Sequence, residues 1–329
     1  MNKITDQRND LLSWFLASGI ITKEGAVLSW LNQKKPGYPY DEITGYATKL
    51  FSLEFKKTGS PLVKEIALKT ARYVANKKSI GRDQHEYIFD LGIVLSGLLS
   101  ARKYCDTKEF DSNIHRIHKH LCENLTKRIC ATENGHAISD DSKWSLYFGP
   151  LMLKMSIPLL EYEYQFGISK RDLWRSYSHE IIEKCFEKQT FYVSQSNREI
   201  YTHPHCYALE GLWVAHTAGV GDYKNILDAG TAWLAENQNK DGSVYNWYQS
   251  KNKQEKNADC TIQSARLWLC WNSNKYASNI KQTIHWAKDL RKGGICYNPH
   301  SEDENAWVTM FFIQLLEWYK NTPVPLDLV

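Results

Sequence analysis

Apolar residues are concentrated in six segments of this chain, and stretches of mixed polarity separate each segment from the next. The six segments begin near Asp41, Glu86, Lys143, Pro204, Ala258 and Asn305. Each is apolar on most sides of a helical projection, as in the run IFDLGIVLSGLLSA, and this favours helices buried inside a domain. Successive segments begin about 50 residues apart, which suits one helical hairpin with its connections.

A second set of predicted helices lies between the apolar segments, and these helices are amphipathic. They cover Pro61–Asn76, Phe110–Arg128, Lys170–Lys188, Tyr223–Asn237 and Ala277–Arg291. Their charged residues fall on one side, as Glu65 and Arg72 do opposite Ile66 and Tyr73. A sixth amphipathic helix is expected at Asp6–Ala17, where it would pack against the last apolar helix.

Similar turns mark the ends of several hairpins. The run EGAVLSW at Glu24–Trp30 resembles DGSVYNW at Asp241–Trp247, and ENGHAI and KGGICY are related to both. Each places Gly where the chain leaves a helix through a positive φ angle, and a short extended stretch follows.

The predicted fold is all-α. Six inner and six outer helices are the number that an (α/α)6 toroid, or six-hairpin barrel, requires. No Pro- or Gly-rich linker divides the chain, so we expect one domain over residues 1–329, with residues 321–329 as a non-helical tail that contains Pro323 and Pro325. An open helical solenoid is the structural alternative.

Composition and charge exclude several classes of function. The chain has 43% hydrophobic and 24% charged residues, which is typical of a globular protein. A net charge of +4, without a Lys/Arg run, argues against a nucleic-acid partner. The apolar run Leu91–Leu99 is too short for membrane insertion, and charged residues interrupt the first 20 positions, so no secretion signal is expected.

The eight cysteines show no CxxC pair, and we expect them to be reduced in a cytoplasmic protein. His115, His118 and His120 lie on one predicted outer helix, where a solvated face is a simpler interpretation than a metal site. No nucleotide-binding or metalloprotease motif is present. No cofactor and no metal are therefore expected.

The ring geometry predicts where chemistry occurs. All inner helices run in the same direction, so their N-termini gather at one face, where unpaired N–H groups suit anionic or polyhydroxylated ligands. Acidic residues there, such as Asp41 and Asp259, also suit helix capping without any other role. The expected substrate-binding residues are Tyr40, Glu42, His85, Tyr87, Trp144, Tyr147, Asp259, Gln263, His300, Asn305 and Trp307.

Five residues are candidates for catalysis: His203, His205, Tyr207, Glu210 and Arg266. His203 and His205 bring two imidazoles to the start of the fourth inner helix. Glu210 lies in an apolar helix, where a carboxylate is costly unless it is paired. Arg266 is a natural partner for such an internal acid, and it would equally bind a substrate carboxylate in bidentate fashion.

Three segments carry a resemblance to a known family: HPHCYALEGLW, DCTIQSARLW and GGICYNPHSEDENAWVTMFFIQLLEWY. They resemble the VpsJ-type polysaccharide biosynthesis proteins of bacterial exopolysaccharide clusters, best from about Tyr201 onward. More distantly, His203 and His205 with Glu210 resemble the N-acylglucosamine 2-epimerases, although the spacing of His and Glu differs. The wider superfamily includes polysaccharide lyases and unsaturated-glycan hydrolases. The resemblance implies a six-hairpin fold and a saccharide or polysaccharide substrate.

Several reactions stay open at this point, with lyase or hydrolase chemistry somewhat preferred. A uronate lyase needs a group that neutralises the carboxylate, a base and an acid. Arg266 or Asn305 would neutralise, His205 or His203 would be the base, and Tyr207 or Tyr87 the acid.

The other reactions need different groups. A glycoside hydrolase needs two carboxylates, available from Glu42, Asp90, Glu210 and Asp259. A sugar 2-epimerase needs two bases, for which His205 and His300 are candidates. A non-catalytic glycan-binding subunit of exopolysaccharide biosynthesis is a further alternative, and the sequence leaves the oligomeric state open.

Overall fold

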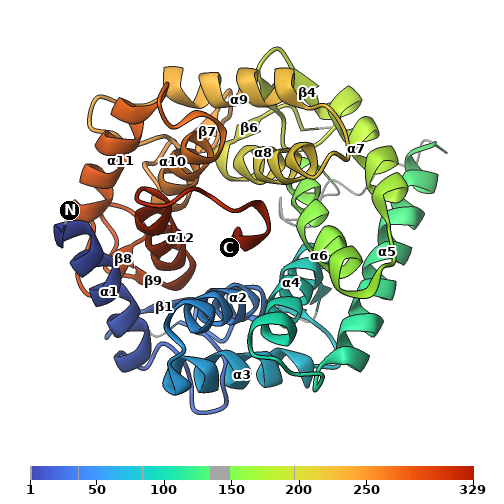
Figure 1. The fold of residues 1–329 in the computed structure, drawn as a ribbon. Coiled ribbons are helices and arrows are strands. Elements are labelled where there is room, and N and C mark those ends of the chain that lie inside the picture. The colour runs from blue at the N-terminus through green and yellow to red at the C-terminus, as the bar shows by residue number, and fades with distance from the viewer. Residues whose placement is uncertain (1, 36, 83–84, 134–148, 196) are drawn as a thin grey trace.

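The described residues of the computed structural model form twelve α-helices in two concentric rings (Figure 1). The structure describes residues 2–35, 37–82, 85–133, 149–195 and 197–329. The inner ring consists of α2 (Asp41–Thr58), α4 (Ile88–Tyr104), α6 (Ser156–Phe166), α8 (Thr202–Thr217), α10 (Ala258–Asn272) and α12 (Ala306–Trp318). The outer ring consists of α1 (Asn2–Ala17), α3 (Pro61–Ala75), α5 (Asp111–Glu133), α7 (Arg171–Cys185), α9 (Lys224–Glu236) and α11 (Ala277–Asp289). The predicted (α/α)6 toroid in a single domain is confirmed.

Burial follows the pattern of polarity along the chain. In the inner helix α4 every residue from Phe89 to Ala101 is buried, because the helix is covered on all sides. In the outer helix α3 only Ala67, Thr70, Ala71, Val74 and Ala75 are buried, a stripe at helical spacing that faces the inner ring. None of the described helices combines the length and apolar character needed to cross a membrane.

Nine strands of two residues each lie in the described loops between helices. A three-stranded sheet has the order β1 (Trp30–Leu31), β9 (Glu304–Asn305), β8 (Ile295–Cys296). The other strands form three antiparallel pairs: β2 (Gly81–Arg82) with β3 (His85–Glu86), β4 (Phe186–Glu187) with β5 (Thr190–Phe191), and β6 (Ile200–Tyr201) with β7 (Trp247–Tyr248).

The ring is closed by contacts between the two ends of the chain. Strand β1 pairs with β9 so that Trp30 is opposite Asn305, and α1 packs against α12. Arg8 of α1 adds ion pairs to Glu54 and Glu317. These contacts join the first hairpin to the last, as a closed toroid requires and an open solenoid does not.

The third inner helix differs from the sequence prediction. The residues around Lys143, where it was expected to begin, lie outside the described part of the chain. From Pro150 to Met155 the backbone is a 3₁₀ helix, η2, and α6 begins only at Ser156. The η2 backbone approaches α8 closely, because a Cβ atom on Gly211 would lie 2.0 Å from the Leu153 carbonyl oxygen.

The end of the chain turns back into the ring. After α12 a short 3₁₀ turn, η3, covers Pro325–Asp327. The tail was predicted to contain no helix, so this turn is a difference from the prediction. Leu328 and Val329 are buried at the centre of the ring, where Figure 1 shows the C-terminus.

Candidate functional site

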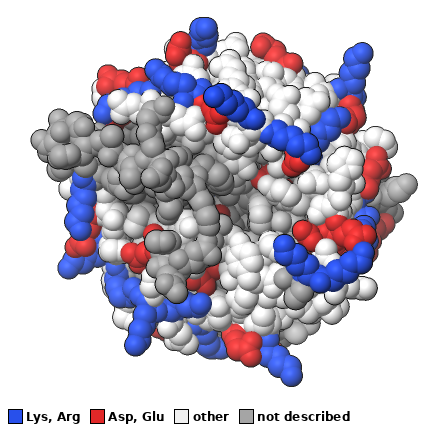
Figure 2. All heavy atoms as spheres, turned by 180° about the vertical axis from the view of Figure 1, so that it is seen from behind, with Lys and Arg blue, Asp and Glu red and all other residues white. Residues whose placement is uncertain are grey.

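The loops that precede the inner helices lie at one end of the ring and form its mouth. Their strands lie behind the inner helices in Figure 1, so the mouth opens on the face that Figure 2 shows. Lys and Arg lie mainly around the periphery of this face. Between the first and last hairpins a pocket of about 610 Å³ is lined by Ser18, Leu31, Asn32, Gln33, Lys34, Lys292, Glu302 and Glu304. This volume is within the range of small-ligand sites.

His203 is the second residue of α8, and its side chain is buried. Its Nδ1 is hydrogen-bonded to the amide oxygen of Gln263 and lies 3.6 Å from Oδ2 of Asp259. Both of these oxygens accept hydrogen bonds, so we assign the imidazole proton to Nδ1. Nε2 is then the basic nitrogen, which is the arrangement of an imidazole that serves as a general base.

Asp259 of α10 connects His203 to two tyrosines. The Tyr297 hydroxyl donates a hydrogen bond to Oδ2 of Asp259 at 3.2 Å, and the Tyr201 hydroxyl interacts with that of Tyr297. Burial, together with the Asp259 carboxylate, raises the pKa of Tyr201 and Tyr297 well above the usual value. Both phenols therefore stay protonated and act as hydrogen-bond donors at neutral pH.

On the opposite side of the ring, α2 contributes Glu42 and Tyr46. The Tyr46 hydroxyl donates to the Tyr207 hydroxyl at 3.1 Å, and the Tyr207 ring lies 4.3 Å from that of His203. The Tyr40 hydroxyl donates to Glu42 at 2.6 Å. Burial raises the pKa of Tyr46 and Tyr207 well above the usual value, and the Glu42 carboxylate adds to both shifts. Asp259 of α10 thus lies beside the His203 imidazole, and Glu42 of α2 is close enough to the neighbouring Tyr207 to act on its phenol.

Aromatic rings and buried polar atoms complete the mouth. Trp247 stacks on Tyr201 with ring centroids 4.3 Å apart, and Trp307 meets the Tyr297 ring edge-on. Among the described residues no hydrogen-bond partner is present for three buried atoms: Nε2 of Gln263, Oδ1 of Asn257 and Nε1 of Trp307. Buried atoms of this kind are destabilising unless a ligand or water completes them. Flat rings beside such atoms suit the apolar face and the hydroxyls of a sugar.

The structure moves His205 out of the predicted site. Its Nδ1 accepts from the Phe191 amide at 3.2 Å, and its Nε2 lies 3.4 Å from the Gly230 carbonyl oxygen. The ring packs on Trp233 of α9, so the side chain lies between the inner and outer helices. Burial lowers the pKa of His205 to about 4. A neutral imidazole with both nitrogens used by the backbone is not available to a substrate.

Glu210 and Arg266 also lie outside the mouth, along the axis of the ring. Both side chains are fully buried and 3.4 Å apart. Lys154 of η2 is the second partner of Glu210, at 2.9 Å, and Arg266 donates to the carbonyl oxygen of Val329. Of the two interpretations of Arg266, the structure supports the partner of an internal acid.

The remaining predicted residues are distributed unevenly. His300 is exposed in the loop between β8 and β9, away from the buried imidazole of His203. Asn305 is the N-cap of α12, where its side chain accepts from the Val308 amide. Tyr87 is buried at the start of α4. Trp144, Tyr147 and the side chain of His85 lie outside the described residues.

Tyr46, Trp247 and Lys154 belong to these clusters and were not singled out from the sequence. Trp247 ends the repeated turn DGSVYNW, in which Trp30 has the equivalent position in the first hairpin, so the repeat was a usable signal. Lys154 interrupts the apolar run LMLKMSIPLL. A charged side chain in such a buried run needs a buried partner of opposite charge. Among the described residues no group of three or more His, Cys, Asp or Glu is arranged to hold a metal ion.

Comparisons with known proteins identify the fold. No protein-family model matches the sequence, and no curated protein is significantly similar to it. An unsaturated glucuronyl hydrolase specific for heparin superimposes with a TM-score of 0.73 and 14% identity over 98% of both chains. Cellobiose 2-epimerase from Bacillus thermoamylovorans B4167 gives 0.69 and 12%, over 95% of this chain and 100% of that one. A polysaccharide lyase gives 0.68 and 10%, over 98% and 99%. The chain therefore has the (α/α)6 fold of these enzymes along its whole length.

Proposed function

We propose that this protein is a carbohydrate-active enzyme that hydrolyses glycosidic bonds at the mouth of the ring. The observation that carries the proposal is the convergence of Glu42 and Asp259 on the buried pair His203 and Tyr207. The similar structures add support, because their names describe enzymes that process glycans. The likeness to exopolysaccharide-cluster proteins suggests a bacterial polysaccharide as the substrate.

Hydrolysis is favoured over uronate elimination by the charges of the mouth. Neither Glu42 nor Asp259 forms an ion pair with a Lys or Arg among the described residues. The two groups expected to neutralise a uronate carboxylate have other partners: Arg266 is bound to Glu210, and Asn305 caps α12. A site in which no described Lys or Arg lies beside the acidic groups suits a neutral pyranose better than an acidic one.

The proposed mechanism uses groups from three helices. His203, oriented by Gln263 and Asp259, takes the place of the carboxylate that serves as base in most glycoside hydrolases. It accepts a proton from water, and the water oxygen forms a bond to the anomeric carbon. Glu42, in its protonated form, gives its proton to the glycosidic oxygen as the bond to the leaving sugar breaks. Asp259 stabilises the imidazolium that results. Trp247 and Tyr201 would stack on the sugar ring.

The proposal is tested by incubating the protein with neutral and acidic bacterial polysaccharides and measuring reducing ends and ultraviolet absorbance. Hydrolysis produces reducing ends without the absorbance of a C4–C5 double bond. Glu42→Gln, Asp259→Asn and His203→Gln should each reduce the rate on the order of 100-fold or more. The matched controls Glu65→Gln and His285→Gln change exposed residues of the outer helices and should leave it unaltered.

Three other outcomes would each replace hydrolysis. Double-bond absorbance would indicate a lyase, with His203 as the base and Tyr207 as the acid. Exchange of the C2 proton of free sugars without cleavage would indicate an epimerase. Glycan binding without any reaction would indicate a binding subunit.

A further inference from the structure

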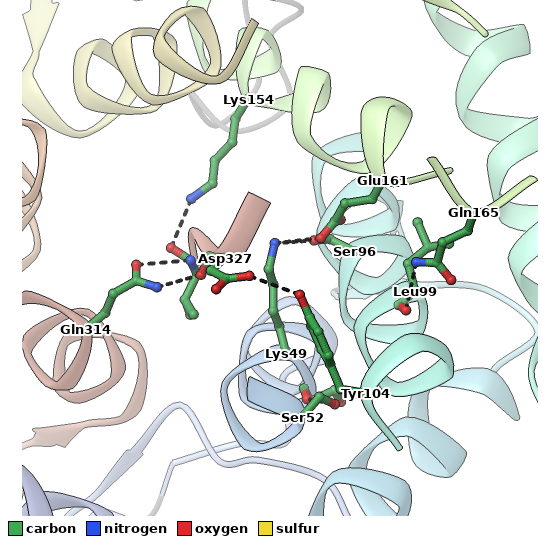
Figure 3. Close-up of polar contacts among 12 residues, drawn as sticks. Lys49, Ser52, Ser96, Leu99, Tyr104, Lys154, Glu161, Gln165, Gln314 and Asp327 are labelled. Atoms are coloured by element: carbon green, nitrogen blue, oxygen red, sulfur yellow. Dashed lines mark hydrogen bonds and ion pairs between the residues drawn. The ribbon is translucent and has the colours of Figure 1, made fainter. Parts of the chain in front are cut away.

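The end of the chain is anchored in the axis of the ring by four side chains. The Val329 carbonyl oxygen accepts from Nζ of Lys154 at 3.4 Å and from the Arg266 guanidinium. Gln314 of α12 holds the segment twice, because it donates to the Asp327 carbonyl at 2.7 Å and accepts from the Val329 amide at 3.1 Å. The Tyr104 hydroxyl donates to the Asp327 carboxylate at 3.1 Å (Figure 3).

These contacts occur where the axis buries several charged side chains. Lys49, Lys154 and Arg266 are buried there with the carboxylates of Glu161 and Glu210. Lys49 forms an ion pair with Glu161, with a distance of 2.9 Å between Nζ and the carboxylate oxygen. Figure 3 shows this pair. Lys154 and Arg266 share the remaining carboxylate, Glu210. A buried cation without a full partner is strongly destabilising. The Val329 backbone oxygen contacts both cations and presents negative charge density to them.

Lys154 also connects the axis to the floor of the mouth. Its Nζ lies 4.4 Å from the centroid of the Tyr207 ring and 4.9 Å from that of Tyr46. An ammonium at this distance is attracted to the face of an aromatic ring, and the attraction strengthens where water is excluded. Tyr207 in turn packs against His203, so a continuous series of contacts leads from Val329 through Lys154 and Tyr207 to the imidazole.

We propose that the segment Val324–Val329 is a positioning element of the mouth: by holding Lys154 it fixes Tyr207, and Tyr207 fixes His203. This inference rests on the proposed function only where activity is measured. Loss of the segment removes the Val329 oxygen from the Lys154 ammonium and admits water to the axis, so the ammonium shifts and Tyr207 loses the cation that packs on its face. The imidazole then loses its neighbour on that side.

The test uses the full chain and two variants that release the segment. One ends after Pro323, and the other is Gln314→Ala, which removes the side chain that holds the segment twice. Lys56→Met is the matched control, because Lys56 is half-exposed and contacts the segment loosely: its ammonium lies 3.8 Å from the Asp327 carboxylate and 4.7 Å from the centroid of the Tyr104 ring. The first readout is the NMR signal of the His203 Cε1 proton, which is assigned by its disappearance in His203→Gln and needs no substrate.

The proposal predicts that both variants, but not Lys56→Met, move the His203 signal by more than its line width. The peptide VPLDLV, added to the truncated protein, should restore the signal, and a scrambled peptide should not. If hydrolysis occurs, kcat should fall on the order of tenfold with little change in KM, because only the alignment of bound groups is altered.

A folded variant with an unchanged His203 signal would overturn the positioning role, whatever the activity. If the truncated chain does not fold, Gln314→Ala decides the question. A shifted signal in a protein without hydrolase activity would uphold the positioning role and overturn only the proposed reaction.

Discussion

His203 and His205 begin the same helix two residues apart, yet their side chains lie in different layers of the ring. His203 faces Gln263 and Asp259 at the mouth, whereas His205 lies between α8 and α9, bonded to the backbone of Phe191 and Gly230. A helix of 3.6 residues per turn separates positions i and i+2 by about 200°, so the two imidazoles face opposite sides. One is placed for chemistry and the other for packing.

Substitutions should separate these two roles. His203→Gln should abolish glycan processing and change the melting temperature little, because glutamine keeps a polar group that can donate to Gln263. His205→Ala should lower the free energy of unfolding by about 2–4 kcal/mol, since it opens a cavity and leaves a buried amide unpaired. Denaturant unfolding of both variants measures this difference. The reverse pattern, an inactive but stable His205→Ala, would place the catalytic imidazole at His205.

Acid should destabilise the protein through buried imidazoles. Burial lowers the pKa of His205 and of His118 to about 4. As the pH falls from 6.5 toward 4, the unfolded chain binds a proton at His205 that the folded protein does not, so the free energy of unfolding falls. For His205 the loss is on the order of 3 kcal/mol.

The variant His205→Asn measures this contribution, because it removes the titrating group and keeps a donor and an acceptor. Its unfolding free energy should depend less on pH between 4 and 6.5 than that of the unsubstituted protein. His285→Gln, at an exposed position of α11, should follow the unsubstituted protein. If the free energy of unfolding depended on pH in the same way for all three proteins, burial would not lower the pKa of His205 in the folded state.

Breaking the buried ion pairs should affect stability first. Glu210→Gln leaves Lys154 and Arg266 without their shared carboxylate and should lower the free energy of unfolding by about 3–5 kcal/mol. Arg266→Ala leaves Glu210 paired with Lys154 but opens a cavity in the axis, and should lower the free energy of unfolding by about 2–4 kcal/mol. Arg72→Ala removes an exposed pair with Glu109 and should change it by less than about 1 kcal/mol. Thermal unfolding compares the three. A stable Arg266→Ala that has lost activity would mean that Arg266 binds the substrate.

Gly211 should tolerate no side chain. An added Cβ would lie 2.0 Å from the Leu153 carbonyl oxygen and 2.6 Å from the Lys154 amide, so α8 and η2 would have to separate. We expect Gly211→Ala to lower the free energy of unfolding by about 1–3 kcal/mol. Gly92→Ala is the comparison, because its Cβ would meet the flexible side chain of Met155 and should be better tolerated. Equal losses of unfolding free energy in the two variants would show that the η2 backbone moves aside as readily as the Met155 side chain does.

The pairing of Glu210 illustrates how far sequence reasoning reaches. A carboxylate among apolar residues of α8 requires a buried partner, and this was one of two interpretations of Arg266, the other being the binding of a substrate carboxylate. The structure places them 3.4 Å apart. Lys154 was missed because it is a single charge inside a segment predicted as an apolar inner helix, and it meets Glu210 only when η2 packs on α8.

The sequence by itself determines most of the helices, their division into an inner and an outer set, and the end of the ring at which the loops before the inner helices gather; the start of α6 is the exception. These features depend on the local periodicity of polar and apolar residues, which the chain carries in every segment. Only the tertiary structure decides that His203 faces the mouth while His205 does not. It also decides that Arg266 forms an ion pair with Glu210 and that Val329 accepts a hydrogen bond from Lys154. Those relationships depend on the rotation of each helix and on contacts between distant segments, and packing sets both only after the ring has closed.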